Sequence, residues 1–227
     1  MKVIAVIPAW NEAPRLRAVL VALKPQVSEI VLVDDGSQDE TATVARAEGV
    51  QVVRHGINRG QGAALKTGTL AALTLGAEVI VHLDADGQHD PSTLETLLEP
   101  LRQNQLDIVY GSRFLGIPGE GMPRSRRLLL RAARLFSAYF LGIPHIITDP
   151  QSGLRAMRAE VARQLVFAQD GMAHCSEILR FVTRSSFRWG EVPVKVQYTE
   201  ASLQKGQKAS EAIKIVWELL LGELVRE

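Results

Sequence analysis

The sequence has little cysteine, few aromatic residues and no long apolar run. Cys175 is the only cysteine, so no internal disulfide can form, which favours a reducing compartment. The longest uncharged apolar stretch, residues 135–148, has 14 residues and contains Pro144, whereas a membrane-spanning helix needs about 20. The first residues lack the basic start and long apolar stretch of a secretion signal. We therefore expect a cytoplasmic protein that does not cross a bilayer.

A strong charge of either sign is also absent. Lysine and arginine number 26 against 25 aspartate and glutamate residues, a net charge of +1, so we expect no nucleic-acid partner. The hydrophobic share of 46% is ordinary for a globular protein and supplies a substantial core. At 227 residues the chain fits one domain, which we predict over residues 1–227.

Apolar runs rich in valine and isoleucine alternate with segments of helical spacing in the first part of the chain. The predicted strands cover residues 3–7, 30–33, 50–53, 79–83 and 108–110. The predicted helices cover residues 16–23, 41–47, 63–75 and 93–101. This alternation predicts right-handed βαβ crossovers, and hence an α/β fold with a mainly parallel sheet between two helical layers. Ser37 and Glu40 have the spacing of a capping box before the second helix.

The alternation ends near residue 113, which divides the chain into residues 1–113 and 114–227. The second part is predicted to hold an arginine-rich helix over 123–141, a loop, a helix over 176–183, a strand over 191–198 and a final helix from about 210. These elements fit a smaller subregion of the same domain.

Three oxygen donors follow the fourth predicted strand, namely Asp84, Asp86 and Gln88. A period of two places the aspartates on one side. Hard cations such as Mg²⁺ or Mn²⁺ prefer oxygen ligands, and a metal at this point would stabilise a diphosphate leaving group. The competing interpretation is a solvated acidic turn. The strand context and the other motifs favour the metal site.

Polar loops also follow the first three predicted strands. Asp34 and Asp35 follow the second strand, and one or the other can accept from a base or from ribose hydroxyls. Glu12 follows the first strand, where it can accept from nucleoside hydroxyls. A surface loop with a capped helix is the alternative for the Asp35 segment. After the third strand, Arg59 and Lys66 flank a glycine-rich helix start of the kind that suits the rim of a nucleotide site.

Six short motifs occur together in a specific order. They are residues 8–12 (PAWNE), 33–37 (VDDGS), 58–60 (NRG), 84–89 (DADGQH), 111–113 (GSR) and 149–155 (DPQSGLR). In this combination the chain resembles family 2 glycosyltransferases of the GT-A fold, over about residues 1–200. It is most similar to the polyprenyl (dolichyl) phosphate mannose or glucose synthases, in a form with the catalytic domain only. The stretch after residue 198 departs from the arginine- and lysine-containing pattern of these relatives.

The resemblance implies that residues 1–113 bind a nucleotide-diphosphate sugar such as GDP-mannose or UDP-glucose. It implies nucleotide contacts, metal ligands for Mg²⁺ or Mn²⁺ and a phosphate contact. The implied nucleotide contacts are Pro8, Ala9, Glu12, Asp35 and Asp84. The implied metal ligands are Asp84, Asp86 and Gln88. The phosphate contact is Arg113, together with a nearby arginine.

The acceptor side is suggested by residues 123–136, which hold five arginines and no acid among leucines at helical spacing. Such a helix can lie at an anionic membrane surface, although a packed helix with paired arginines is nearly as compatible. For a lipid phosphate acceptor, Arg113 with Arg124, Arg126 or Arg127 would orient an oxygen that is already anionic.

An acceptor hydroxyl would instead need a general base, for which Asp149 is the candidate. We favour polyprenyl phosphate, attack opposite the departing nucleotide, inversion at the anomeric carbon and a peripheral position at the cytoplasmic face of a membrane.

Two other functions remain open from the sequence. Sugar-1-phosphate nucleotidyltransferases share a nucleotide-binding α/β domain, but they carry a glycine-rich segment after the first strand, where this chain has Ala9-Trp10-Asn11-Glu12. A binding module at the membrane surface would keep the fold without turnover. It predicts donor binding without metal-dependent release of nucleoside diphosphate.

Overall fold

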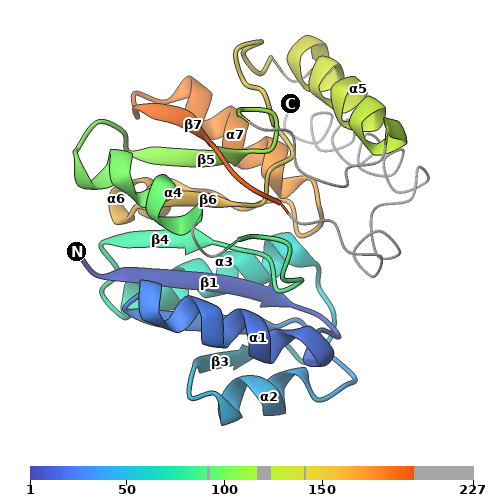
Figure 1. Cartoon of the computed structure of the whole chain (residues 1–227), viewed down its shortest axis with the longest axis vertical. Helices are drawn as coiled ribbons and strands as arrows, with labels where there is room; N and C mark the ends of the chain where they lie inside the picture. Colours follow the sequence, from blue (N-terminus) through green and yellow to red (C-terminus); the bar gives the residue numbers. More distant parts are fainter. Residues whose placement is uncertain (91–92, 117–123, 141, 197–227) are drawn as a thin grey trace.

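The computed structural model describes all residues except 91–92, 117–123, 141 and 197–227. Its centre is a seven-stranded sheet in the order β3-β2-β1-β4-β6-β5-β7 (Figure 1). The strands are β1 (Val3–Ala9), β2 (Glu29–Asp34), β3 (Gln51–Arg54), β4 (Val79–His82), β5 (Ile108–Ser112), β6 (Arg155–Arg158) and β7 (Trp189–Pro193).

Six strands run in the same direction, and β6 alone is antiparallel, to both β4 and β5. The mainly parallel sheet predicted from the sequence is confirmed. The carboxyl ends of β1, β2, β4 and β5 meet at one edge, as parallel strands require. Because β6 is reversed, its amino end reaches this same edge, and the segment before Arg155 lies beside the ends of β4 and β5.

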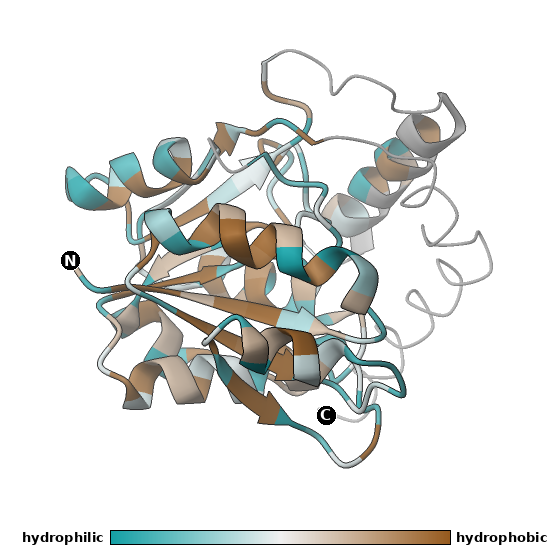
Figure 2. Ribbon diagram, turned by 60° about the horizontal axis from the view of Figure 1, so that its bottom comes forward, coloured by the Kyte–Doolittle hydropathy of each residue, from teal (hydrophilic) through white to brown (hydrophobic). Residues whose placement is uncertain are grey.

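Helices cover both faces of the sheet, which completes the predicted three layers (Figure 2). Residues of β1 alternate between them, with Val3, Ala5 and Ile7 in one core cluster and Ile4 and Val6 in the other. The first cluster includes side chains of α1 (Ala13–Leu23), α2 (Thr41–Ala47) and α4 (Thr93–Arg102). The second includes side chains of α3 (Gln61–Thr74), α6 (Ala159–Gln164) and α7 (His174–Arg184).

The second part of the chain differs from the prediction at two elements. Strand β6 and helix α6 lie in the segment predicted as a loop. The sequence of β6 does not predict a buried strand because its first residue, Arg155, is charged. In the structure the side chain of Arg155 is nevertheless fully buried. Strand β7 begins at Trp189, two residues before the predicted start, and the final helix predicted from about 210 lies outside the described residues.

The predicted capping box before α2 is wrong. The N-cap residue is Glu40, which makes no side-chain cap, and Ser37 lies outside the helix. The Ser37 hydroxyl instead accepts from the Asn11 N–H at 2.9 Å, and the Ser37 N–H donates to Asp34 Oδ1 at 3.0 Å. The bond from Asn11 ties the loop after β2 to the loop after β1, and the bond to Asp34 closes the turn after β2.

Helix α5 (Arg124–Phe140) is present where the arginine-rich helix was predicted. It lies apart from the helices that cover the sheet, on the side toward which β1 points (Figure 1). Arg134 Nη2 donates to the carbonyl of His145 at 2.7 Å, and Tyr139 meets the His145 ring edge-on. Among the described helices, none combines the length and apolarity that a bilayer crossing demands.

Gly68 lets α3 approach the sheet closely. A Cβ atom at this position would lie 2.3 Å from Val6 Cγ1 and 3.1 Å from Val33 Cγ2. Both valines are β-branched core residues with little room to move. The distance between α3 and the sheet therefore depends on this glycine.

We expect Gly68→Ala to lower the free energy of unfolding by about 1–3 kcal/mol through overpacking. The loss should occur even though alanine favours a helix over glycine by about 1 kcal/mol. Urea unfolding measures the effect. Gly56→Ala is the control, because no atom lies within 4 Å of its added Cβ and its stability should stay close to wild type. Equal stability of the two variants would contradict this packing.

Candidate active site

A cleft of about 550 Å³ opens at the edge where the carboxyl ends of the parallel strands meet. Eight of the predicted site residues line it. They are Pro8, Ala9, Glu12, Asp35, Asp84, Asp86, Gln88 and Arg113. Further walls come from Gln151, Ser152 and Gly153, which precede β6, and from Leu130 of α5. The cleft therefore brings together residues from all six sequence motifs and one residue of the arginine-rich helix.

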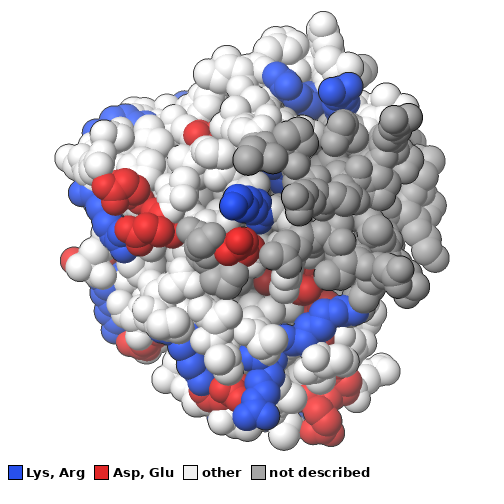
Figure 3. All heavy atoms as spheres, viewed as in Figure 1, with Lys and Arg blue, Asp and Glu red and all other residues white. Residues whose placement is uncertain are grey.

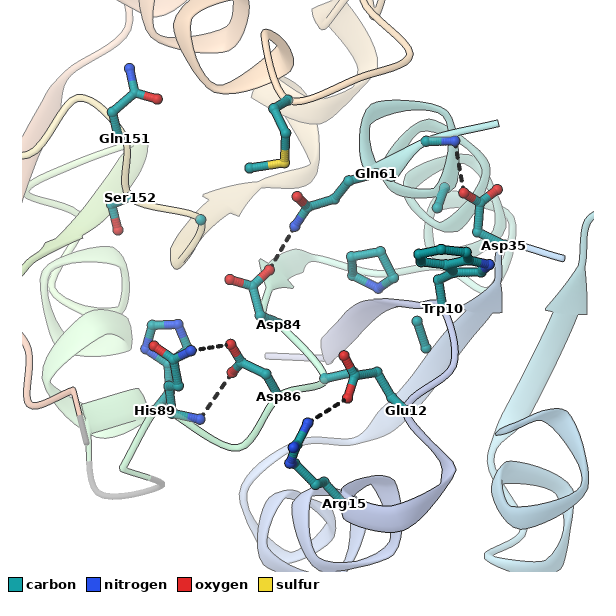
Figure 4. Close-up of a pocket in the computed structure, with 18 of the residues that line it drawn as sticks. Trp10, Glu12, Arg15, Asp35, Gln61, Asp84, Asp86, His89, Gln151 and Ser152 are labelled. Atoms are coloured by element: carbon teal, nitrogen blue, oxygen red, sulfur yellow. Dashed lines mark hydrogen bonds and ion pairs between the residues drawn. The ribbon is translucent and has the colours of Figure 1, made fainter. Parts of the chain in front are cut away.

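Asp84 and Asp86 follow β4 and lie on the floor of the cleft (Figure 4). Asp84 Oδ1 accepts a 2.7 Å hydrogen bond from Gln61 Nε2. Asp86 accepts from the Gln88 N–H at 3.0 Å and from Gln88 Nε2 at 2.6 Å. Burial, then the charges of Asp84 and Glu12, raise the pKa of Asp86 to about 6 against the bonds from Gln88. The site thus destabilises its own negative charge, and a cation would relieve that cost.

The predicted metal site has too few grouped protein ligands to hold a metal ion alone, and it fits the structure only if a bound substrate supplies further oxygen ligands. Within the described residues, no three histidine, cysteine, aspartate or glutamate side chains are grouped to hold a metal. Mg²⁺ is commonly held by one or two carboxylates together with substrate phosphates, and Asp84 and Asp86 supply two carboxylates. Gln88 is engaged here as a hydrogen-bond donor to Asp86.

Glu12 lies across the cleft from the two aspartates, beside Arg15, whose Nη1 is 3.3 Å from Glu12 Oε2 (Figure 4). The preceding Asn11 adopts φ 54°, and its side-chain oxygen accepts from the Gln38 N–H at 2.9 Å. Trp10 stands at the rim with 53% of its surface exposed. The turn after β1 therefore presents one carboxylate and one aromatic face to the cleft.

Asp35 holds the loop after β3 in place. Its Oδ1 accepts from the Arg59 N–H at 3.0 Å, its Oδ2 accepts from the Gly60 N–H at 2.7 Å, and His55 Nδ1 is 2.6 Å from Oδ1. The side chain is almost completely buried. Asp35 thus has a structural role at the wall of the cleft, whatever it contributes to ligand binding.

The structure does not bring the side chains of Arg59 and Lys66 into the cleft. Arg59 Nη2 is 3.5 Å from Asp170 Oδ2, and Lys66 Nζ donates to the Phe167 carbonyl at 3.4 Å. The start of α3 is closed by this same loop, because the Ala63 N–H donates to the Asp170 carbonyl at 3.1 Å. The segment after α6 thus engages the side chains of Arg59 and Lys66, whereas Asn58, Gly60 and Gln61 of the same region line the cleft.

Arg113 reaches the cleft in a fixed orientation. Its Nε and Nη2 donate to the two carboxylate oxygens of Asp149 at 2.6 and 2.7 Å. Asp149 is buried and does not line the cleft, and its backbone N–H donates to Glu191 Oε1 at 2.9 Å. Asp149, predicted as a possible general base, therefore lies behind Arg113 and holds its guanidinium.

Three predicted residues fall on α5. Arg124, Arg126 and Arg127 belong to this helix, but their side chains lie outside the described part of the structure. On the described atoms of the face in Figure 3, basic and acidic side chains are interspersed, in keeping with the net charge of +1.

Sequence reasoning assigned no role to several residues that line the cleft. Gln61 and Met172 were missed, as were His89, Gln151, Ser152 and Gly153, although the last four lie in recognised motifs. Two glycines flanking Gln61 at a helix start were the available signal. Met172 carries no local signal, because its place depends on the segment between α6 and α7.

The raised pKa of Asp86 predicts a pH-dependent cost in the metal-free protein. Its folded value of about 6 exceeds the ordinary 3.8, so the folded state holds the proton more tightly between these values. The cost is absent below pH 4 and complete above pH 6. We expect the unfolding free energy of Asp86→Asn, relative to wild type, to improve by about 1–3 kcal/mol between pH 4 and 7.

Urea unfolding across this pH range measures that difference. Asp107→Asn is the control, because hydrogen bonding to Arg188 lowers the pKa of Asp107, so this carboxyl titrates below the range measured and its difference from wild type should stay nearly flat between pH 4 and 7. A flat difference for Asp86→Asn would contradict the burial of this carboxylate in an acidic site.

Comparison with solved structures confirms the GT-A fold. The structure of glucosyl-3-phosphoglycerate synthase from Mycobacterium tuberculosis with Mn²⁺, uridine diphosphate and glucosyl-3-phosphoglycerate superimposes with a TM-score of 0.78 at 21% identity. The match covers 99% of this chain and 79% of that chain.

Sequence comparisons give the family. The UDP-N-acetylglucosamine–dolichyl-phosphate N-acetylglucosaminyltransferase of Methanococcus voltae is 31% identical, over 95% of this chain and 94% of its own length. The undecaprenyl-phosphate mannosyltransferase of Micrococcus luteus is 35% identical, over 73% of this chain and 70% of its own. The family described as glycosyl transferase family 2 matches residues 4–166. The chain therefore belongs to glycosyl transferase family 2 and is a glycosyltransferase.

Proposed function

We propose that the chain transfers a hexose, or a related sugar, from a nucleotide diphosphate to a polyprenyl phosphate with inversion at the anomeric carbon. One observation carries the proposal: two carboxylates after β4 and the guanidinium of Arg113, which Asp149 holds in place, line the same cleft. Two of the relatives above are named for transfer to dolichyl or undecaprenyl phosphate, which supports the same acceptor class.

On the donor side, the nucleoside would lie against Pro8, Ala9 and Trp10, with Glu12 in reach of hydroxyl groups. The diphosphate would lie over Asp84 and Asp86, where Mg²⁺ or Mn²⁺ would neutralise the charge of the leaving group. The raised pKa of Asp86 supports this placement, because two facing carboxylates favour a bound cation. The structural neighbour was crystallised with Mn²⁺ and a uridine nucleotide, which is consistent with this placement.

On the acceptor side, Arg113 would bind the lipid phosphate. Asp149 and the Glu191 behind it hold the guanidinium toward the cleft, so little ordering cost remains for binding. A phosphate oxygen is already anionic and needs no general base. Both oxygens of Asp149 are engaged by Arg113, and this favours the phosphate over a hydroxyl acceptor that would need Asp149 to remove a proton.

Helix α5 would place the cleft at a membrane surface. Leu128, Leu135 and Tyr139 are 69%, 55% and 74% exposed and follow one another at helical spacing on one side of α5. Arg131 is exposed on the same helix. Apolar residues beside arginines are typical of helices that lie in the interface of an anionic bilayer, so the protein would be peripheral at the cytoplasmic face.

A donor panel tests the function. GDP-mannose, UDP-glucose and UDP-N-acetylglucosamine are each supplied with Mn²⁺ or Mg²⁺, with and without a short polyprenyl phosphate. We expect metal-dependent release of nucleoside diphosphate with one donor, increased by the lipid phosphate, and a product of inverted anomeric configuration. Release that is indifferent to the lipid phosphate but increased by a polyprenol or a saccharide would contradict the acceptor assignment.

Two variants separate the halves of the cleft in this assay. Asp86→Ala should lower turnover at least 100-fold while the protein stays folded, because this carboxylate contributes to the leaving-group site and not to packing. Arg113→Ala should raise the half-saturating concentration of the lipid phosphate at least tenfold, with less effect on the donor. A selective loss of donor affinity in Arg113→Ala would contradict its role.

Membrane docking is tested with liposomes containing phosphatidylglycerol. We expect the double variant Leu128→Ser, Leu135→Ser to lower the bound fraction at least fivefold, and high salt to weaken binding of the wild type. Leu70→Ser on α3 is the matched control, since Leu70 is 57% exposed and belongs to another face. Equal binding by the double variant and the control would exclude this side of α5 as the docking surface.

A further inference from the structure

Gln61 is the first residue of α3, and its side chain crosses the wall of the cleft to reach Asp84 (Figure 4). Its Nε2 donates to Asp84 Oδ1 at 2.7 Å, a length typical of a bond to a charged acceptor. Asp84 is two residues beyond the end of β4, in the loop that follows the strand. The hydrogen bond from Gln61 therefore sets one end of this carboxylate.

Gly153 sets the other end. A Cβ atom at residue 153 would lie 2.9 Å from Asp84 Oδ2 and 3.3 Å from Oδ1. The carboxylate is thus seated directly against the backbone of the segment that leads into β6. The backbone torsions of Gly153 are not in the left-handed region, so an added Cβ would act by displacing this carboxylate and not through backbone strain.

Gln61 is itself held by backbone contacts on both sides. The Gly60 N–H donates to Asp35 Oδ2 at 2.7 Å. A Cβ on Gly62 would lie 2.1 Å from the Gln169 carbonyl oxygen, so the start of α3 is pressed against the segment after α6. Because its neighbours are anchored in this way, Gln61 has little freedom to withdraw from Asp84.

We infer that Gln61 and Gly153 are positioning residues for Asp84. Gln61 holds Oδ1 by a hydrogen bond, and Gly153 leaves room for Oδ2, so that one orientation of the carboxylate faces the metal and diphosphate. The inference rests on the proposed metal-dependent function. Partners that orient a ligating carboxylate are typically worth 10–100-fold in metal affinity.

Gln61 also lines the cleft, so a direct contact with the donor is the competing role. The two roles differ in what they change. A direct contact strengthens nucleotide binding whether or not metal is present. Orientation of Asp84 changes only the gain in nucleotide affinity that the metal brings.

The experiment is isothermal titration of the full chain with UDP and with GDP, each with and without Mn²⁺. For the nucleotide that binds, the measured quantity is the dissociation constant without Mn²⁺ divided by the dissociation constant with Mn²⁺. This ratio is the Mn²⁺-dependent gain in affinity. Gln61→Met keeps the length and helix propensity of the side chain and removes the donor. Gly153→Ala displaces the same carboxylate from the opposite side. Gln51→Met, at the exposed amino end of β3, is the matched control.

We expect Gln61→Met and Gly153→Ala each to lower the Mn²⁺-dependent gain about tenfold, with metal-free nucleotide affinity and melting temperature within error of wild type. Gln51→Met should keep the full gain. The double variant should lose little more than either single variant, because both act on one carboxylate.

Two outcomes would overturn the inference while the proposed function stands. One is an unchanged gain in both variants. The other is a loss of metal-free nucleotide affinity in Gln61→Met with the gain preserved, which would make Gln61 a donor contact. A wild type whose nucleotide affinity ignores Mn²⁺ would overturn the metal site itself. If Gln61→Met does not fold, the result for Gly153→Ala alone decides.

Discussion

The hydrogen bond between Arg155 and His82 joins the antiparallel strand to the centre of the sheet. Arg155 Nε donates to His82 Nδ1 at 2.9 Å, and both side chains are fully buried. Arginine is only a donor, so Nδ1 accepts and Nε2 carries the proton, which it donates to Thr69 Oγ1 at 2.9 Å. Burial, aided by the charge of Arg155, lowers the pKa of His82 well below its usual value and keeps the ring neutral.

This buried link brings three elements into register beneath the cleft. His82 ends β4, Arg155 begins β6 and Thr69 lies on α3. Asp84 is two residues beyond His82, and Gly153 is two residues before Arg155. Gln61 lies on the same helix as Thr69. The contact of Asp84 with Gly153 and Gln61 therefore depends on a link that is itself remote from any ligand.

The cleft places like charges together at a cost in stability. Asp84, Asp86 and Glu12 lie around one space, and the pKa of Asp86 is raised first by burial and then by the negative charges of Asp84 and Glu12. Around Arg113, which we propose binds the acceptor, the charges are paired, since Asp149 neutralises Arg113 behind the wall. Such a division suits a reaction in which negative charge gathers on the donor side as the bond to the sugar breaks.

Local pattern determined much of the fold and of the donor side. Valine- and isoleucine-rich runs predicted the first five strands because their burial on both faces leaves a continuous apolar signal. The acidic residues after β4 were recognised as a candidate metal site because several side-chain oxygens follow directly after a buried strand. Arg113 and Asp149 were each identified, but no sequence pattern indicated that Asp149 binds Arg113 at 2.6 Å.

The tertiary structure alone decided which residues face one another. Strand β6 escaped prediction because a buried arginine reads as a surface residue until its partner His82 is known. Arg59 and Lys66 were predicted at the rim, but the segment after α6 closes that side of α3. The sequence by itself determined the fold class, the family and the acidic motif, because these depend on neighbouring residues. The orientation of Asp84 depends on Gln61 and Gly153, contributed by segments far apart in the chain, and only their packing reveals it.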